Sequence, residues 1–399
     1  MRFLDLPPEI RTQIYSILLE PAAFRRELND GYVEHNYKDM LSLYHTNKQI
    51  YYESRRVFRR LNIFVLIRTP WSDAKHHVMS DGRVSILASG DLAAQFVFHT
   101  MAVEIDAPVY QHHDNMECWI MTAEDLDKFC KYWFYTNLTI ETLNPHLTLD
   151  LTLRDPYAQE GEDKMVLKEL QQKLFEPFGQ IKKLRDVTVS GDPQPYKSVV
   201  AAMRAAMEQP MESPAKCLAD ATRLKDQGNV ELKAGRYAEA LELYRQSWLA
   251  MHIIIRGKER QVHGDPYFNC VLDEEPFKGQ HGGTVRVVLR IRLVANSVLA
   301  YYKMDDYEMA IHTGMRTIRI MRASLGLEAD EEAADPAQET ITQFIAAPEL
   351  GKIYYRTALA YKALDNKDEA RKLLRVAVIY LPNEPHVQQE LAACALRIL

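Results

Sequence analysis

The sequence predicts a mostly α-helical protein made of three successive regions, and three observations lead to this prediction. Residues 1–60 carry apolar side chains at helical spacing, residues 61–205 alternate between strand-like and helix-like patterns, and residues 214–399 contain three similar helix–turn–helix segments. The chain has 399 residues, which suits two to three domains. We therefore expect a helical module, a small α+β middle region and a C-terminal helical array.

The first region opens with FLDLPPEIRTQIY, which places two prolines in the first turn of a helix, where proline is tolerated. Apolar residues then follow at helical spacing at Ile10, Ile14, Tyr15 and Leu18. The stretch LSLYHTNKQIYYESRRVFRRLN predicts a second helix, and IFVLI after it has the pattern of a strand. The residues that the second helix should direct inward are Leu43, Ile50, Val57 and Phe58.

The stretch FLDLPPEIRTQIYSILLEP resembles the F-box-like opening of a large group of fungal proteins, in which Leu-Pro-x-Glu-hydrophobic begins a short helical module. TNKQIYYESRRVF is similar to the continuation of those proteins, which often lead into leucine-rich-like β/α units. The resemblance implies docking on the adaptor subunit of a ubiquitin ligase, and the docking residues must then form a partly exposed apolar patch. They are Leu4, Leu6, Pro7, Ile10 and Ile14. The alternative is that Leu6, Ile10 and Ile14 are the core of the module.

The middle region reads as strands at 96–105, 146–153 and 184–191. TAEDLDKFCKYWF opens with a threonine cap and an acidic first turn, which is typical of a helix. An amphipathic helical pattern at 161–181 separates the last two strands. Strand–helix–strand at this spacing predicts a parallel pair of strands.

The third region contains three segments with a common pattern of small residues. A small or apolar residue in the first helix is followed twelve positions later by alanine, as Gly228→Ala240, Val298→Ala310 and Ala358→Ala370. Turns are expected near Gly235, Asp305 and Asp365, and the third segment adds Ala377 and Pro382 at its end. These positions resemble the tetratricopeptide repeat, a helix–turn–helix unit that stacks into a solenoid with a concave groove.

Polar residues recur in the first helix of each segment. They follow the pattern KxxxN, then N, then KxxxR, which looks like the carboxylate clamp of co-chaperones. The resemblance implies that the groove grips the C-terminal Glu-Glu-Val-Asp tail of the seventy- and ninety-kilodalton heat-shock chaperones, since cations and amides suit a peptide with two carboxylates. The five clamp positions are Lys225, Asn229, Asn296, Lys352 and Arg356. Arg292, one turn before Asn296, could add to them.

Each clamp residue taken alone could equally be an ordinary solvated helix residue. The spacings between the three first helices also exceed those of uninterrupted repeats, because two insertions intervene at 256–284 and 325–345. The clamp requires that these insertions loop out. If they instead added helices to the stack, the five residues would not meet.

Composition limits the other possibilities. The net charge of −6 excludes a chain-wide basic footprint for nucleic acid. The five scattered cysteines favour reduced thiols, and neither His76 and His77 nor His112 and His113 have metal-site spacing. No secretory signal core or bilayer-length apolar run is present in the sequence. We expect a cytoplasmic, possibly nuclear protein that is not an enzyme and has no cofactor, metal, nucleic acid or membrane partner.

Two functions remain open at this point. One is a non-enzymatic interaction adaptor whose groove holds the acidic tail of a heat-shock chaperone. The other is an F-box-type substrate adaptor of a cullin-RING ubiquitin ligase, with the repeats receiving the substrate. Convergence of the five clamp side chains favours the first, and exposure of the N-terminal apolar residues favours the second.

Overall fold

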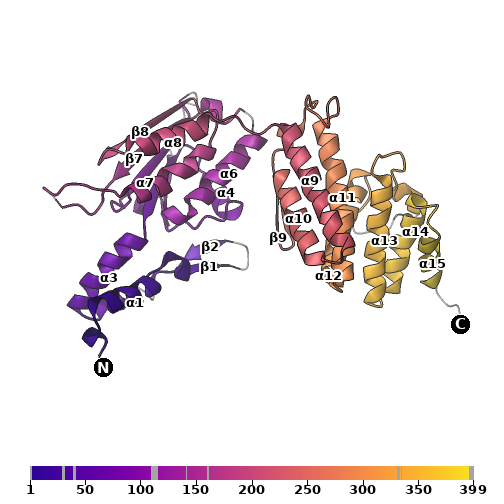
Figure 1. The fold of residues 1–399 in the computed structure, drawn as a ribbon, viewed down its shortest axis with the longest axis horizontal. Coiled ribbons are helices and arrows are strands. Elements are labelled where there is room, and N and C mark those ends of the chain that lie inside the picture. The colour runs from indigo at the N-terminus through magenta and orange to yellow at the C-terminus, as the bar shows by residue number, and fades with distance from the viewer. Residues whose placement is uncertain are drawn as a thin grey trace. The chain divides into compact units, whose positions relative to one another are not determined.

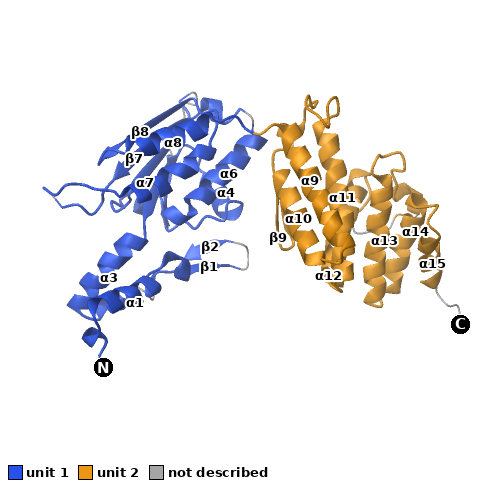
Figure 2. Ribbon diagram, viewed as in Figure 1, with its two compact units in different colours: residues 1–211 blue, residues 212–399 orange. Residues whose placement is uncertain are grey.

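The computed structural model describes residues 2–28, 32–38, 42–108, 116–140, 142–159, 161–329, 333 and 335–394. Helices predominate in this part of the chain and are accompanied by a mixed β-sheet, which confirms a mostly α fold (Figure 1). The chain forms two compact units, residues 1–211 and 212–399 (Figure 2). The boundary falls where the predicted middle and C-terminal regions meet.

Unit 1 begins with a helical module. Its elements are η1 (Phe3–Asp5), α1 (Pro8–Leu18), η2 (Pro21–Phe24), the antiparallel strands β1 (Arg25–Glu27) and β2 (Val33–His35), η3 (Ser42–His45) and α3 (Lys48–Leu61). The Asn47 side chain caps α3 by accepting a hydrogen bond from the backbone N–H of Ile50 at 2.9 Å. The buried centre of the module is Tyr15, Leu19 and Val57. As predicted, Leu43, Ile50 and Phe58 pack against this centre.

The inward face of α1 differs from the prediction. Tyr15 and Leu19 are buried, whereas Ile10 and Leu18 are exposed. The apolar residues of α1 surround the helix, so their spacing alone does not say which of them faces α3. The interpretation of Leu6, Ile10 and Ile14 as the core of the module is therefore wrong, since none of them belongs to it.

A six-stranded sheet follows, in the order β4-β6-β3-β5-β7-β8. Its strands are β3 (Phe64–Thr69), β4 (Ala88–Ser89), β5 (Met101–Asp106), β6 (Glu117–Thr122), β7 (Thr148–Arg154) and β8 (Asp186–Asp192). β3 is parallel to β5, and β7 is parallel to β8, while the remaining neighbours are antiparallel. The α+β middle region and the parallel β7–β8 pair are thus confirmed. The antiparallel pairings differ from the regular parallel strands of a leucine-rich repeat.

Helices cover one face of the sheet and form the main core of unit 1 (Figure 1). They include α4 (Ala74–Ser80), α6 (Leu126–Thr139), α7 (Lys168–Phe175) and α8 (Lys197–Glu208), with η4 (Ala123–Asp125), η5 (Asn144–His146) and η6 (Glu176–Gln180) beside them. Leu149, Leu151 and Leu153 alternate along β7 and all face this core. The short helix α5 (Asp91–Ala94) contributes Ala93 to a second, smaller hydrophobic cluster. The other buried members of this cluster are strand residues that do not belong to the main core.

Three details of the middle region differ from the sequence prediction. The predicted strand at 96–105 begins only at Met101, and Phe96 instead packs edge to face on Phe64 at 5.4 Å between ring centroids. Strand β6 was not predicted, since its run ECWIMT is short and apolar without alternation. The long helical pattern at 161–181 is helical only over α7 and η6.

Unit 2 contains three successive helical hairpins. They are α9 (Pro214–Lys233) with α10 (Tyr237–Ala250), α11 (Gly282–Lys303) with α12 (Tyr307–Ser324), and α13 (Ala347–Ala363) with α14 (Lys367–Tyr380). Helix α15 (Pro385–Ala393) packs on α14. The first helices α9, α11 and α13 contact one another in order, so the hairpins stack (Figure 1).

The turns of the three hairpins share one backbone conformation. Gly235, Asp305 and Asp365 have positive φ values of 79°, 58° and 59°. These are the positions expected from the sequence, and glycine and aspartate are among the residues that adopt this left-handed conformation most readily. Ala240, Ala310 and Ala370 are fully buried, as the close approach of paired helices requires.

Gly228 provides a test of this close approach. A Cβ atom at this position would lie 2.5 Å from Cε1 of Tyr244. We expect Gly228→Ala to destabilise unit 2 by about 1–2 kcal/mol, because overpacking outweighs the better helix propensity of alanine. Gln227→Ala, on the exposed side of the same helix, is the control and should be neutral in chemical denaturation. Equal stability of the two variants would contradict the close packing.

The two insertions add no α-helix to the stack among the residues described. The first contains the hairpin β9 (Ile253–Arg256) and β10 (Glu259–Val262), and then η7 (Pro266–Phe268). The second contains η8 (Pro336–Glu339). Both are held firmly to unit 2: Phe268 is buried in its core, and Glu339 is fully buried. The predicted clamp requires that the insertions do not add helices to the stack, and the described residues meet this requirement.

Candidate peptide-binding site

The five predicted clamp residues lie on the three first helices of unit 2. Lys225 and Asn229 are on α9, Asn296 is on α11, and Lys352 and Arg356 are on α13. Because α9, α11 and α13 are neighbours, residues that are far apart in the sequence meet here.

Asn229 is at the centre of the site. Its Oδ1 accepts a hydrogen bond from Nδ2 of Asn296 at 2.7 Å and another from the hydroxyl of Tyr244 at 2.9 Å. Two donors on the oxygen fix the orientation of the amide, so its NH2 group points away from them. The partner of that NH2 group is Oδ1 of Asp226, at 3.4 Å. On the side of Asp226 the Asn229 amide therefore presents N–H donors, while its oxygen is taken up by Tyr244 and Asn296.

Arg356 is anchored to the neighbouring helix. Its Nη1 donates to the carbonyl oxygen of Ala295 at 2.6 Å, which places the guanidinium beside Asn296. Burial lowers the pKa of Arg356, and the nearby Tyr244 acts in the opposite direction. Burial also raises the pKa of Tyr244 to about 12, so this hydroxyl remains a neutral donor at physiological pH. A guanidinium has donors to spare after one bond to a carbonyl.

The two lysines extend the site by one helical turn. Lys225 is nearly buried and its Nζ lies 2.8 Å from Oδ1 of Asp226. Lys352 is half-buried, and its ammonium has no hydrogen-bond partner among the described residues. In the described part of the chain neither lysine makes a direct hydrogen bond to Asn229, Asn296 or Arg356, and Lys225 reaches Asn229 only through Asp226. Of the three cations in the set, only Lys225 is joined to a carboxylate by an ion pair in the described part of the chain, so positive charge is in excess among these residues.

Two residues of this site were not predicted. Tyr244 comes from a second helix, α10, and enters because Gly228 leaves room for its ring. Asp226 bridges Lys225 and Asn229 with a single oxygen. The sequence did contain a signal for Tyr244: a glycine at position 228, and a tyrosine one turn after Ala240. Arg292 instead pairs with Glu349, at 3.5 Å between Nε and Oε1.

Comparison of the chain with models of protein families, with curated proteins and with solved structures found no match in any of the three. In the described residues, no cluster of three or more His, Cys, Asp or Glu side chains could hold a metal ion. His112 and His113 lie outside the described residues. None of the described helices has both the length and the apolar character needed to cross a bilayer.

The predicted docking residues at the N-terminus form a second candidate site. Leu4 and Ile10 are exposed to 37% and 40%, Pro7 is exposed, and Leu6 and Ile14 are partly exposed. Ile17, one turn after Ile14, is exposed to 71%. The five residues thus satisfy the exposure that docking requires.

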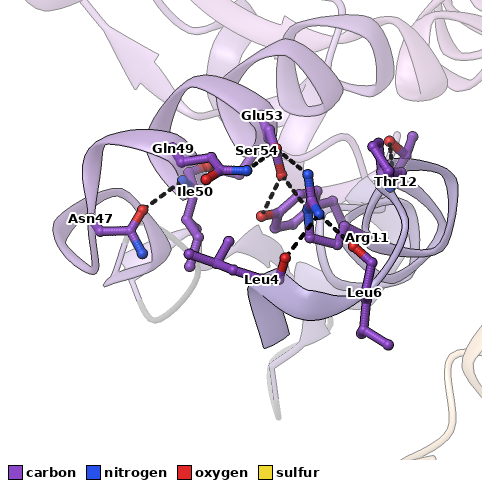
Figure 3. A network of polar contacts seen from close by, with 11 residues as sticks. Leu4, Leu6, Arg11, Thr12, Asn47, Gln49, Ile50, Glu53 and Ser54 are labelled. Carbon is purple, nitrogen blue, oxygen red and sulfur yellow. Dashed lines mark hydrogen bonds and ion pairs between the residues drawn. The ribbon is translucent and has the colours of Figure 1, made fainter. Parts of the chain in front are cut away.

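A partly buried ion pair between Arg11 and Glu53 holds this surface in place (Figure 3). Arg11 makes two hydrogen bonds to Glu53 on α3, at 2.9 and 2.6 Å, and a third to the carbonyl oxygen of Leu6 at 2.5 Å. Gln49 and Tyr15 also donate to Glu53. These bonds fix the segment from Leu4 to Leu6 against α1 and α3, so its apolar side chains are presented in a defined arrangement.

Proposed function

We propose that this protein is a non-enzymatic interaction adaptor whose C-terminal unit binds the acidic C-terminal tail of a heat-shock chaperone. In this proposal residues 214–399 are a tetratricopeptide domain of the carboxylate-clamp type. The observation that carries it is that side chains of the first and third hairpins both reach α11: Asn229 is hydrogen-bonded to Asn296, and Arg356 donates to the backbone carbonyl of the preceding residue, Ala295. Its polar groups present donors, as a carboxylate ligand requires.

The contacts suggest how the tail is held. The terminal carboxylate accepts hydrogen bonds from the NH2 group of Asn229 and from the guanidinium of Arg356, while Lys352 pairs with the acidic side chain. Lys225 becomes the fourth donor to the tail when a carboxylate of the peptide replaces Asp226 as its partner. In the free protein the Asp226 carboxylate occupies the position between Lys225 and Asn229 that a ligand carboxylate would take.

Calorimetric titration of the full chain with a peptide ending in Glu-Glu-Val-Asp tests the proposal. We expect micromolar binding, about −8 kcal/mol, that is abolished by amidation of the peptide C-terminus and by Lys352→Ala. Asp226→Asn should bind several-fold more tightly, because it removes the internal competitor. Lys303→Ala, which removes an exposed lysine at the far end of α11, is the control and should bind normally. Binding that is indifferent to amidation would refute the clamp.

The exposed N-terminal surface supports a second candidate function, that of an F-box-type adaptor of a cullin-RING ubiquitin ligase. The purified ligase adaptor subunit should then bind the full chain, and Ile10→Asp should abolish this binding. Leu92→Asp replaces a leucine that is 74% exposed elsewhere in unit 1, and it should have no effect. If the wild-type chain does not bind the subunit, this function is excluded. The two functions can coexist, because their sites are in different units.

A further inference from the structure

Unit 1 contains a pocket that neither proposed function uses. It has a volume of about 420 Å³ and lies where β3 and β5 end, with Thr69 and Ile105 in its wall. Pockets that hold small molecules have volumes of about 300–1,000 Å³. The carboxyl ends of parallel strands in open sheets are also a common place for ligands. Since β3 and β5 are parallel neighbours, the position and the size both suit a small-molecule site.

The walls of the pocket are rich in aromatic rings. Trp71, Trp119, Phe129, Tyr132 and Trp133 all line it. Phe129 contacts Trp119 and Trp133 edge to face, at 6.3 and 6.1 Å between ring centroids, so these rings are fixed against one another. Trp71 stands at the rim and is 39% exposed. A flat apolar molecule would find matching surfaces here.

Two residues that line the pocket each carry a buried polar atom without a partner. Nε1 of Trp119 and Oγ1 of Thr69 are buried, and neither makes a hydrogen bond within the described part of the chain. Both residues are only 1% exposed. The contrast with Trp133 is informative, because its Nε1 donates to Oδ1 of Asn144 at 2.9 Å. A buried indole N–H without an acceptor costs free energy that a ligand could recover.

The charges around the pocket limit the class of ligand. No lysine or arginine lines it, and its titratable side chains are Asp73, His77 and Tyr132. An anion would have no counter-charge and would meet the carboxylate of Asp73. The ligand is therefore not an anion. A cationic group such as an ammonium would give the indole N–H of Trp119 no acceptor, and because this N–H can only donate, the polar atom of the ligand must be an acceptor.

We propose that this pocket binds a small, neutral aromatic molecule that carries a hydrogen-bond acceptor such as a carbonyl oxygen. The rings of the wall pack on its flat faces. The acceptor receives the hydrogen bond of Trp119, and the Thr69 hydroxyl supplies a second donor. This site belongs to unit 1 and is independent of peptide binding in unit 2.

The test uses the full chain and three probes of one shape. 2-Acetylnaphthalene has the carbonyl, 2-isopropenylnaphthalene lacks the acceptor, and 2-naphthoate replaces it with a charge. We expect the ketone to bind roughly fivefold more tightly than the hydrocarbon, and the naphthoate to bind most weakly. In ¹⁵N spectra the indole N–H signal of Trp119, assigned with Trp119→Phe, should move downfield with the ketone by more than the ring-current shift that the hydrocarbon also causes.

Two threonines of α6 provide a matched pair of variants. Thr136 and Thr139 each donate to the carbonyl four residues earlier, at 3.0 Å, but only Thr136 lines the pocket. Thr136→Met should weaken binding of the ketone by at least about tenfold, because the larger side chain fills the cavity. Thr139→Met should leave this binding unchanged. The proposal is overturned if the ketone does not bind, if both variants behave alike, or if the naphthoate binds best. It is also overturned if the Trp119 signal responds equally to the ketone and the hydrocarbon.

Discussion

We expect Glu339→Ala to destabilise unit 2 by about 3–5 kcal/mol, the cost of leaving a buried charge without its partner. Glu339 is fully buried, and its Oε2 accepts a hydrogen bond from Nε of Arg322 at 2.9 Å. Arg322 itself is 4% exposed and so cannot turn to water. The same carboxylate also accepts from the backbone N–H of Ala333 at 2.9 Å and, at 3.4 Å, from the hydroxyl of Tyr354.

This residue links three parts of the unit. It lies in the second insertion, Arg322 is in the last turn of α12, and Tyr354 belongs to α13. Its loss should therefore lower the denaturation midpoint of the whole of unit 2 rather than loosen the insertion alone. Glu328→Ala removes an exposed carboxylate just after α12 and should change stability by less than about 0.5 kcal/mol. If both variants lower the free energy of unfolding in urea by a similar, small amount, the Arg322–Glu339 ion pair is dispensable.

Glu53→Gln should destabilise unit 1 by on the order of 2 kcal/mol at pH 7, and the effect should vanish in acid. The hydrogen bonds from Arg11, followed by those from Gln49 and Tyr15, lower the pKa of Glu53 from 4.5 to about 2, against the opposing effect of burial. The folded state therefore binds this proton less readily than the unfolded state. The resulting stabilisation is complete above pH 4.5 and is lost as the pH falls toward 2.

The measurement is the difference in unfolding free energy between the wild type and Glu53→Gln, followed from pH 6 to pH 3. This difference should be constant above pH 5 and shrink below pH 4.5. Using a difference removes the contribution of other carboxylates, which titrate in both proteins. Glu20→Gln, at an exposed site of the same module, should have the same unfolding free energy as the wild type at every pH. A difference for Glu53→Gln that is independent of pH would mean that the lost contacts are not ionic.

Much of the local structure could be predicted from the sequence because its causes are local. The turns at Gly235, Asp305 and Asp365 follow from residues that adopt positive φ, and alanines twelve positions after a small residue mark the paired helices. The parallel pair β7–β8 follows in the same way from a strand–helix–strand pattern. The five clamp positions and the five N-terminal docking positions came from resemblances to the co-chaperone clamp and to the F-box-like opening, and their roles stay predictions.

The sequence by itself determined which residues form helices, strands and turns in most of this protein, and which polar residues could meet if three hairpins stack. Only the tertiary structure decided that Tyr15 and Leu19 face the core instead of Ile10, because a helix that is apolar on several sides has no single inward face. It also decided that Asn229 meets Asn296 and Tyr244, and that Arg322 pairs with Glu339. These contacts join residues on different elements, and their geometry depends on how side chains pack in three dimensions rather than on any spacing along the chain.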